Sequence, residues 1–164
     1  MNKIGVLGEE LVSRWLELQN YMLLQQNWRC RWGEIDIIAQ NRDGKTIAFV
    51  EVKTRSRNNW DEGGLLAVDA TKQKKIIQTA SLFLAEYPQL AEFDCRFDVA
   101  LVSYKDLTQF ERFLAPCVGA GSRKRREDAK DIKELFKLKI GRSVNMEKYR
   151  LTIENYIQSA FELA

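Results

Sequence analysis

Two apolar segments separated by Asp43-Gly44 constrain the fold of this chain more than any other feature of its sequence. Residues 33–41 and 46–54 are apolar at nearly every position around their acidic residues, which is typical of strands buried on both faces. An Asp-Gly pair between two such segments indicates a two-residue hairpin turn. We therefore predict two adjacent antiparallel strands in the interior of the protein.

The turn also predicts which residues face one another across the hairpin. With Asp43 and Gly44 alone as the loop, Asp36 lies directly opposite Glu51, and Glu34 lies opposite Lys53. Directly opposed residues have Cβ atoms about 5 Å apart, and residues two apart share one face of a strand. A longer loop could slip this pairing, and a slip of one residue would place the acids on opposite faces.

Opposed carboxylates on buried strands require compensation. Like charges directly across a sheet are destabilising, and a buried unpaired carboxylate costs several kcal/mol, of order 2–7 for a polar group. A divalent cation held by both Asp36 and Glu51 would remove this cost, whereas Lys53 supplies a single positive charge. The alternative is a purely structural network, in which Glu34 pairs with Lys53 and the two opposed acids bind backbone groups or arginines.

Histidine is absent from the sequence, which excludes several kinds of hydrolase. Ser-His-Asp hydrolases, Cys-His proteases and HExxH metalloproteases all need an imidazole. Hydrolysis here would therefore depend on carboxylates, lysine and metal. The cysteines Cys30, Cys95 and Cys117 are odd in number and form no CxxC pair, so we expect free thiols rather than disulfides or a zinc site.

Hydrophobic periodicity predicts a single α/β domain over residues 1–164, a length that suits one core. The order helix, three strands, helix, strand indicates a mixed β-sheet flanked by helices. Residues 149–163 show both alternation and a helical pattern, so their structure stays open. The elements expected before them are a helix over 5–18, strands over 21–29, 33–41 and 46–54, a helix over 69–87 that Thr71 helps to cap, and a strand over 96–104.

A basic segment stands out near the C-terminus. Residues 123–150 contain eleven Lys or Arg against five Asp or Glu, although the whole chain carries a net charge of only +3. Residues 123–140 are predicted to form an amphipathic helix that ends at Gly141. Its first four residues are candidates for contacts with a phosphate backbone, with a solvated helix face as the equal alternative. These four residues are Arg123, Lys124, Arg125 and Arg126.

Asp36 followed by Glu51-Val52-Lys53 resembles the signature of PD-(D/E)XK nucleases, although Ile35 stands where that signature has proline. More narrowly, the chain resembles the UPF0102, or YraN-like, family, which is similar to archaeal Holliday junction resolvases. Residues 105–149 depart from that family pattern as an insert whose role the resemblance does not supply. The matching segments are residues 5–9, 27–29, 33–38, 49–55, 72–73, 96–99 and 153–161.

The resemblance implies a restriction-endonuclease-like fold and an endonuclease dependent on Mg²⁺ or Mn²⁺, acting on DNA that includes branched or structured forms. Asp36, Glu51 and the backbone carbonyl near Val52 would hold the ion. Lys53 would orient the attacking water or stabilise the transition state. Glu9 is a further candidate ligand or water-holding residue, or else only a carboxylate near a helix start.

Other residues have weaker assignments. Glu34 is an accessory acid or only a partner of Lys53. Arg55, Lys72 and Gln73 are candidates for phosphate contact, although a solvated surface explains them equally well. The tryptophans are expected in the core or as isolated surface aromatics, with Trp32 as one of two candidates for base stacking.

Two other functions remain open: a nucleic-acid-binding module without cleavage, and an adaptor that docks a protein through the insert helix. The resolvase likeness also suggests a homodimer. Residues 1–11 contain no secretory signal and no apolar run approaches the roughly 20 residues that span a bilayer, so we expect a cytoplasmic protein without membrane contact.

Overall fold

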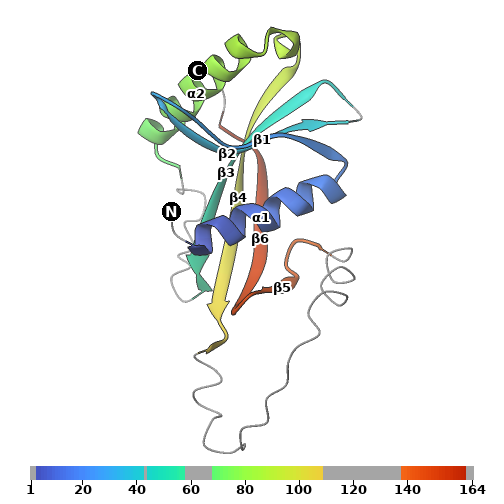
Figure 1. Ribbon diagram of the computed structural model, residues 1–164, viewed down its shortest axis with the longest axis vertical. Coiled ribbons are helices and arrows are strands. Elements are labelled where there is room, and N and C mark those ends of the chain that lie inside the picture. Colours follow the sequence, from blue (N-terminus) through green and yellow to red (C-terminus); the bar gives the residue numbers. More distant parts are fainter. Residues whose placement is uncertain (1–2, 43, 58–67, 109–137, 162–164) are drawn as a thin grey trace, which may run out of the picture.

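A computed structural model describes residues 3–42, 44–57, 68–108 and 138–161. A six-stranded mixed sheet forms the centre, with helices on its two faces (Figure 1). The predicted order helix, three strands, helix, strand is confirmed, and two further strands follow it. In chain order the elements are α1 (Lys3–Leu18), β1 (Tyr21–Cys30), β2 (Gly33–Asn41), β3 (Thr46–Ser56), α2 (Ala70–Glu86), the 3₁₀-helix η3 (Pro88–Leu90), β4 (Asp94–Asp106), β5 (Ser143–Met146) and β6 (Tyr149–Phe161).

The strands are arranged in the order β1-β2-β3-β4-β6-β5. β3 and β4 run parallel and are connected through α2, as a parallel pair requires. The other neighbouring strands are antiparallel. None of the helices in the described ranges is long and apolar enough to cross a bilayer.

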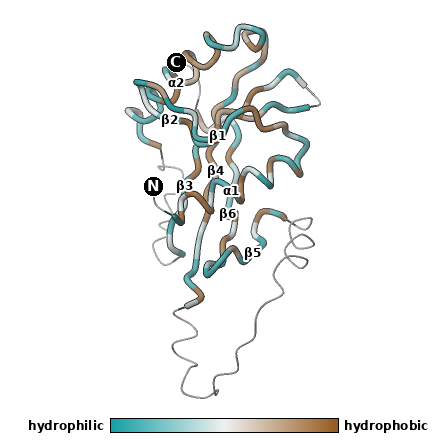
Figure 2. The backbone as a smooth tube through the Cα atoms, viewed as in Figure 1, coloured by the Kyte–Doolittle hydropathy of each residue, from teal (hydrophilic) through white to brown (hydrophobic). Residues whose placement is uncertain are grey.

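Two apolar layers sandwich the sheet, because successive side chains of a strand point to opposite faces. On β3, Ala48 and Val50 pack in the layer that contains α1, whereas Ile47 and Phe49 pack in the layer that contains α2. Figure 2 shows hydrophobic segments along the central strands, between the two helices. The prediction that the hairpin strands are buried on both faces is confirmed.

The predicted register of the β2–β3 hairpin is confirmed over four residue pairs, from Ile37–Val50 to Gln40–Ile47. The loop is longer than predicted, because β2 ends at Asn41 and β3 begins at Thr46. Lengthening the loop by one residue on each side leaves the pairing unchanged. Asp43 itself lies outside the described residues.

Capping of α2 differs from the prediction. Asp69, rather than Thr71, caps the helix, and its side chain accepts a hydrogen bond of 2.8 Å from the backbone N–H of Lys72. An aspartate at the N-cap satisfies one of the helix's unpaired N–H groups and also favours the positive end of the helix dipole.

The C-terminal segment forms a strand, β6, that pairs with β4. The helix predicted over residues 123–140 lies mostly outside the described part, together with Arg123, Lys124, Arg125 and Arg126. Its last residues correct the prediction: Leu138 is buried in the α1 layer and residues 138–140 are not helical. The chain is instead held toward the sheet there, since the N–H of Gly141 donates to the carbonyl of Ile153 at 2.8 Å.

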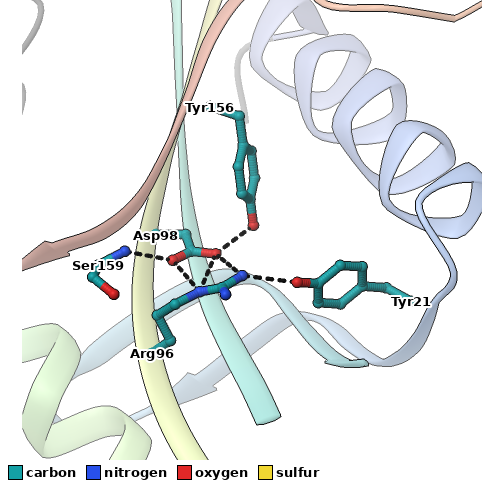
Figure 3. A network of polar contacts seen from close by, with 5 residues as sticks. All are labelled: Tyr21, Arg96, Asp98, Tyr156 and Ser159. Atoms are coloured by element: carbon teal, nitrogen blue, oxygen red, sulfur yellow. Dashed lines mark hydrogen bonds and ion pairs between the residues drawn. The ribbon is translucent and has the colours of Figure 1, made fainter. Parts of the chain in front are cut away.

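A buried polar network connects β4 with β6 and β1 (Figure 3). Asp98 has no exposed surface, and the guanidinium of Arg96 donates to both of its carboxylate oxygens at 2.9–3.1 Å. The hydroxyl of Tyr156 and the backbone N–H of Ser159 also donate to Asp98, at 2.6 and 3.0 Å. Arg96 donates further to the hydroxyl of Tyr21 at 2.8 Å. Asp98, which Arg96 holds in place, therefore anchors the end of β6 through Tyr156 and Ser159.

Candidate active site

The sheet is irregular where the candidate site lies. Pairing of β2 with β3 ends at Ile37 and Val50, and pairing of β2 with β1 skips Asp36. The side-chain alternation of β2 also breaks there, because Ile37 packs in the α1 layer whereas Ile35 packs in the α2 layer. Asp36 therefore sits where the regular ladder opens, so that its side chain can bond to the backbone of β3.

The Asp36 carboxylate takes the place of a strand carbonyl. Its Oδ2 accepts a hydrogen bond of 2.7 Å from the backbone N–H of Val52. Asp36 is only 8% exposed and Glu51 only 4%. Both carboxylates are thus removed from bulk solvent. The predicted direct pairing of Asp36 with Glu51 is not part of the ladder, which ends at Ile37 and Val50.

Two lysines lie against the Glu51 carboxylate. Lys53 Nζ is 2.7 Å from Oε1, and Lys72 Nζ, from the first turn of α2, is 3.2 Å from Oε2. The contact of Lys72 lacks hydrogen-bond geometry, so Oε2 is a buried oxygen without a hydrogen-bond partner among the described residues. That oxygen is available to a further positively charged group.

Burial raises the pKa of Asp36 to about 7, and the nearby Glu51 carboxylate adds to the increase. The hydrogen bond from Val52 and the charge of Lys72 act in the opposite direction, whereas Glu9 raises the pKa further. Burial is thus the main reason that the charged form of Asp36 is unfavourable, and the neighbouring acids add to it. A bound cation would favour the charged form.

Glu9 reaches the site from α1. Its Oε2 accepts a hydrogen bond of 2.8 Å from the side-chain amide of Asn27 on β1. Burial raises the pKa of Glu9, and the neighbouring charges of Glu34 and Glu51 contribute to the increase. Asn27 has φ +52°, a left-handed conformation that asparagine tolerates better than most residues. Sequence reasoning did not assign a role to Asn27, although an asparagine inside a strand segment was a usable signal.

α1 approaches β3 closely at Gly8. A Cβ atom added to Gly8 would lie 2.0 Å from Thr54 Oγ1 and 3.2 Å from Thr54 Cβ. Thr54 Oγ1 is buried without a hydrogen-bond partner among the described residues. Any larger residue at position 8 would push α1, and with it the adjacent Glu9, away from the sheet.

We expect Gly8→Ala to destabilise the protein by about 1–3 kcal/mol, because overpacking a tight contact forces a shift of the helix. Gly5→Ala, in the same helix, is the matched control: its added Cβ meets only Glu9 Oε1, at 4.0 Å. It should stabilise by roughly 0.5–1 kcal/mol through helix propensity. Chemical denaturation measures both changes. Thr54→Ala should restore most of the loss in Gly8→Ala, and an unchanged loss in that double variant would contradict the contact.

The remaining predicted residues are placed less centrally. The expected Glu34–Lys53 pair is not formed: Glu34 pairs instead with Arg29 at 3.0 Å, because Lys53 is held by Glu51. Arg55 lies exposed near the end of β3. The Gln73 amide donates to the carbonyl of Val68 at 2.9 Å, which gives this side chain a role in holding the start of α2.

The donor set fits a small divalent cation. No three Asp, Glu or Cys side chains converge on a common point within the described ranges, so an ion here would bind two carboxylates, with backbone and water completing its shell. Mg²⁺ characteristically binds in this way. Asp36 and Glu51, whose Oε2 contacts Lys72 but has no hydrogen-bond partner among the described residues, are the side chains that would hold it. Val52, predicted to offer its carbonyl, contacts Asp36 through its N–H.

Comparison with known proteins identifies a matching family model and relatives that align with nearly the whole chain. Residues 8–102 match the family model described as "Uncharacterised protein family UPF0102". UPF0102 protein sll0189 of Synechocystis sp. is 45% identical over 161 residues, covering 98% of this chain and 99% of its own length. A UPF0102 protein of Trichodesmium erythraeum is 43% identical over 167 residues, 96% of this chain and 87% of the relative. These two alignments cover nearly the whole chain and so extend through residues 105–149.

Proposed function

Because this chain belongs to the UPF0102 family, whose description names no activity, we propose its function from the site: an endonuclease, dependent on Mg²⁺ or Mn²⁺, that cleaves DNA. The observation that carries the proposal is the buried pair of Asp36 and Glu51 with two lysines around it. A purely structural network would give every buried carboxylate oxygen a hydrogen-bond partner, whereas Oε2 of Glu51 has none among the described residues.

The chain's own residues divide the chemistry. Asp36 and Glu51 would hold the ion between β2 and β3. When bound, such an ion supplies Lewis-acid chemistry and lowers the pKa of a water molecule. Lys53 and Lys72 contact the two oxygens of Glu51, so their ammonium groups would stabilise negative charge on a phosphate bound at this site. Glu9, oriented by Asn27, is placed to hold a water molecule or a proton at the edge of the site.

The substrate is proposed from charge as well as from chemistry. Lysines at a carboxylate site can bind an anionic group beside the ion. A phosphodiester is anionic, and its oxygens can also bind the ion. DNA, including its branched forms, is the substrate that the likeness to resolvases favours. A homodimer stays a prediction of the same likeness, and a cytoplasmic location stays a prediction from the sequence.

The test joins cleavage with metal binding. Wild-type protein, Glu51→Gln and Lys53→Ala are incubated with junction, flap, single-stranded and duplex DNA in Mg²⁺, Mn²⁺ or EDTA. Calorimetry measures Mn²⁺ binding in parallel. We expect metal-dependent cleavage by the wild type, loss of both properties in Glu51→Gln, and loss of cleavage with retained Mn²⁺ binding in Lys53→Ala, since lysine is not a ligand.

Glu86→Gln is the matched control for Glu51→Gln, since Glu86 is exposed near the far end of α2. It should bind Mn²⁺ and cleave as the wild type does. Equal cleavage by all four proteins would overturn the assignment of the site. Binding of DNA by all of them without cleavage in any metal would point instead to a binding module.

A further inference from the structure

The turn between β1 and β2 exposes an aromatic side chain next to a cation. Trp32 is 43% exposed, and the guanidinium carbon of Arg31 lies 5.0 Å from the centre of its ring. This separation is within the range of a cation–π contact. The contact holds the indole against its neighbour and leaves much of the ring surface open to a ligand.

α2 supports this turn. A Cβ added to Gly33 would lie 3.6 Å from Thr79 Oγ1 and 3.9 Å from Lys75 Cβ. Cys30 Sγ lies 3.7 Å from the same Thr79 hydroxyl and accepts a hydrogen bond of 3.4 Å from the backbone N–H of Trp32. The exposed ring therefore stands on a turn that is packed against a helix, which makes it a supported surface.

A line of positive charge connects this turn with the candidate active site. Lys72 contacts Glu51, and Lys75, three residues later in α2 and hence on the same helix face, lies beside Gly33. Arg31 and Lys75 form no ion pair with any residue in the described ranges. Besides Lys72, which is paired with Glu51, the surface from Glu51 to Trp32 thus carries two cations, Lys75 and Arg31, that can bind a polyanion.

We propose that Trp32 stacks on an unpaired base of the nucleic-acid strand that is cleaved, while Lys75 and Arg31 contact its backbone; this rests on the proposed function. Trp32 precedes Asp36 by four residues, so at about 3.3 Å per residue the two are at most roughly 13 Å apart. That distance corresponds to about four stacked nucleotides at 3.4 Å each. In a regular duplex the faces of the bases are covered by their neighbours, so the surface selects strands with unpaired or unstacked bases near the cut.

Binding is tested without divalent metal, so that the result does not depend on cleavage. Fluorescence anisotropy compares a short single-stranded DNA, an RNA of the same sequence and the corresponding blunt DNA duplex. The proteins are wild type, Trp32→Ala, Trp32→Phe and Met22→Ala. Met22 is the matched control, because it is 40% exposed on β1, at the end of that strand opposite the turn that carries Trp32.

We expect Trp32→Ala to weaken single-strand binding by about 5- to 150-fold, the range of one base stacked on an aromatic ring. Trp32→Phe should keep most of the affinity, and Met22→Ala all of it. Duplex affinity should change less than single-strand affinity in every variant. A loss on DNA, on RNA or on both supports the proposal and identifies the preferred sugar.

Single-strand affinity of Trp32→Ala equal to that of the wild type would overturn the proposal, as would an equal loss on single strands and duplex. Thermal melting of each variant confirms that it is folded. A failure of the proposed function gives a different result: Glu51→Gln would cleave as the wild type does, or neither protein would cleave, whatever Trp32→Ala does to binding. The two outcomes are therefore separable.

Discussion

Replacing Asp36 with asparagine is expected to stabilise the metal-free protein at pH 8 while reducing nucleic-acid cleavage by about 10³-fold. Asparagine keeps an oxygen that can accept the hydrogen bond from the N–H of Val52. It removes the negative charge that burial and Glu51 make unfavourable. The activity loss corresponds to the several kcal/mol of transition-state stabilisation that a held ion contributes.

The pH dependence of stability follows from the direction of the pKa change. The pKa of Asp36 is raised to about 7 in the folded protein, against roughly 3.9 in an unfolded chain. Between these two values the folded state binds more protons than the unfolded state. The free energy of unfolding therefore falls as pH rises from about 4 to about 7, by up to about 4 kcal/mol in total, and stays low above that range.

Denaturant titrations of the metal-free protein between pH 4 and pH 9 measure this curve. Asp36→Asn should flatten it, and added Mn²⁺ should raise the stability of the wild type above pH 7 but leave the variant unchanged. Asp94→Asn is the matched control, because Asp94 is exposed at the start of β4 and should leave the wild-type curve unaltered. If Asp36→Asn were less stable than the wild type at pH 8, the prediction would be contradicted, because the Asp36 charge would then be stabilised by its neighbours in the folded protein.

Asp98→Asn is expected to cost about 3–5 kcal/mol of stability, the effect of breaking a buried ion pair. Burial alone would lower the pKa of Arg96, but its hydrogen bonds to Asp98 and Tyr21 outweigh burial and raise it. The guanidinium stays charged in the variant and loses its counter-charge. Burial raises the pKa of Tyr156, with the Asp98 charge adding to the effect, so the phenol remains a donor throughout the accessible pH range.

Unfolding by denaturant measures this loss, and two further variants identify its cause. Adding Arg96→Leu to Asp98→Asn should recover much of the loss, because it removes the uncompensated charge. The asparagine oxygen can still accept from the N–H of Ser159, and its NH2 group can donate to the Tyr156 hydroxyl, which then acts as the acceptor. Glu34→Gln breaks the exposed Arg29–Glu34 pair and should cost less than about 1 kcal/mol. A loss of that small size in Asp98→Asn would contradict the role given to the network.

Elements specified by local pattern could be predicted from the sequence, and β6 could not. The Asp-Gly turn and the apolar segments beside it identified the β2–β3 hairpin and its register. β6 departs from simple alternation because its pairing with β4 shifts register twice, once opposite Phe97 to Val99 and once opposite Leu101 and Val102. Ser159, in the first irregularity, has φ +48°. Such bulges blur the two-residue period on which strand prediction depends.

Some residues of the candidate site could likewise be predicted from the sequence, and others could not. Asp36, Glu51 and Lys53 were identified because one hairpin brings them together. The contact of Lys72 with the Glu51 carboxylate depends on how α2 packs on the sheet, and the bond from Asn27 to Glu9 depends on how α1 lies beside β1. No spacing along the chain encodes these contacts. They follow from tertiary packing, which a single sequence does not display.

The hydrogen bond between the N–H of Leu107 and the carbonyl of Lys148, at 2.9 Å, ties the chain just after β4 to the turn between β5 and β6. Next to it, Asp106 pairs with Tyr149 across β4 and β6. The chain returns to the sheet at a second attachment, where the N–H of Gly141 donates to the carbonyl of Ile153. Because both ends of the intervening segment are bound to the sheet, we expect substitutions within residues 109–137 to alter binding more readily than the arrangement of Asp36 and Glu51.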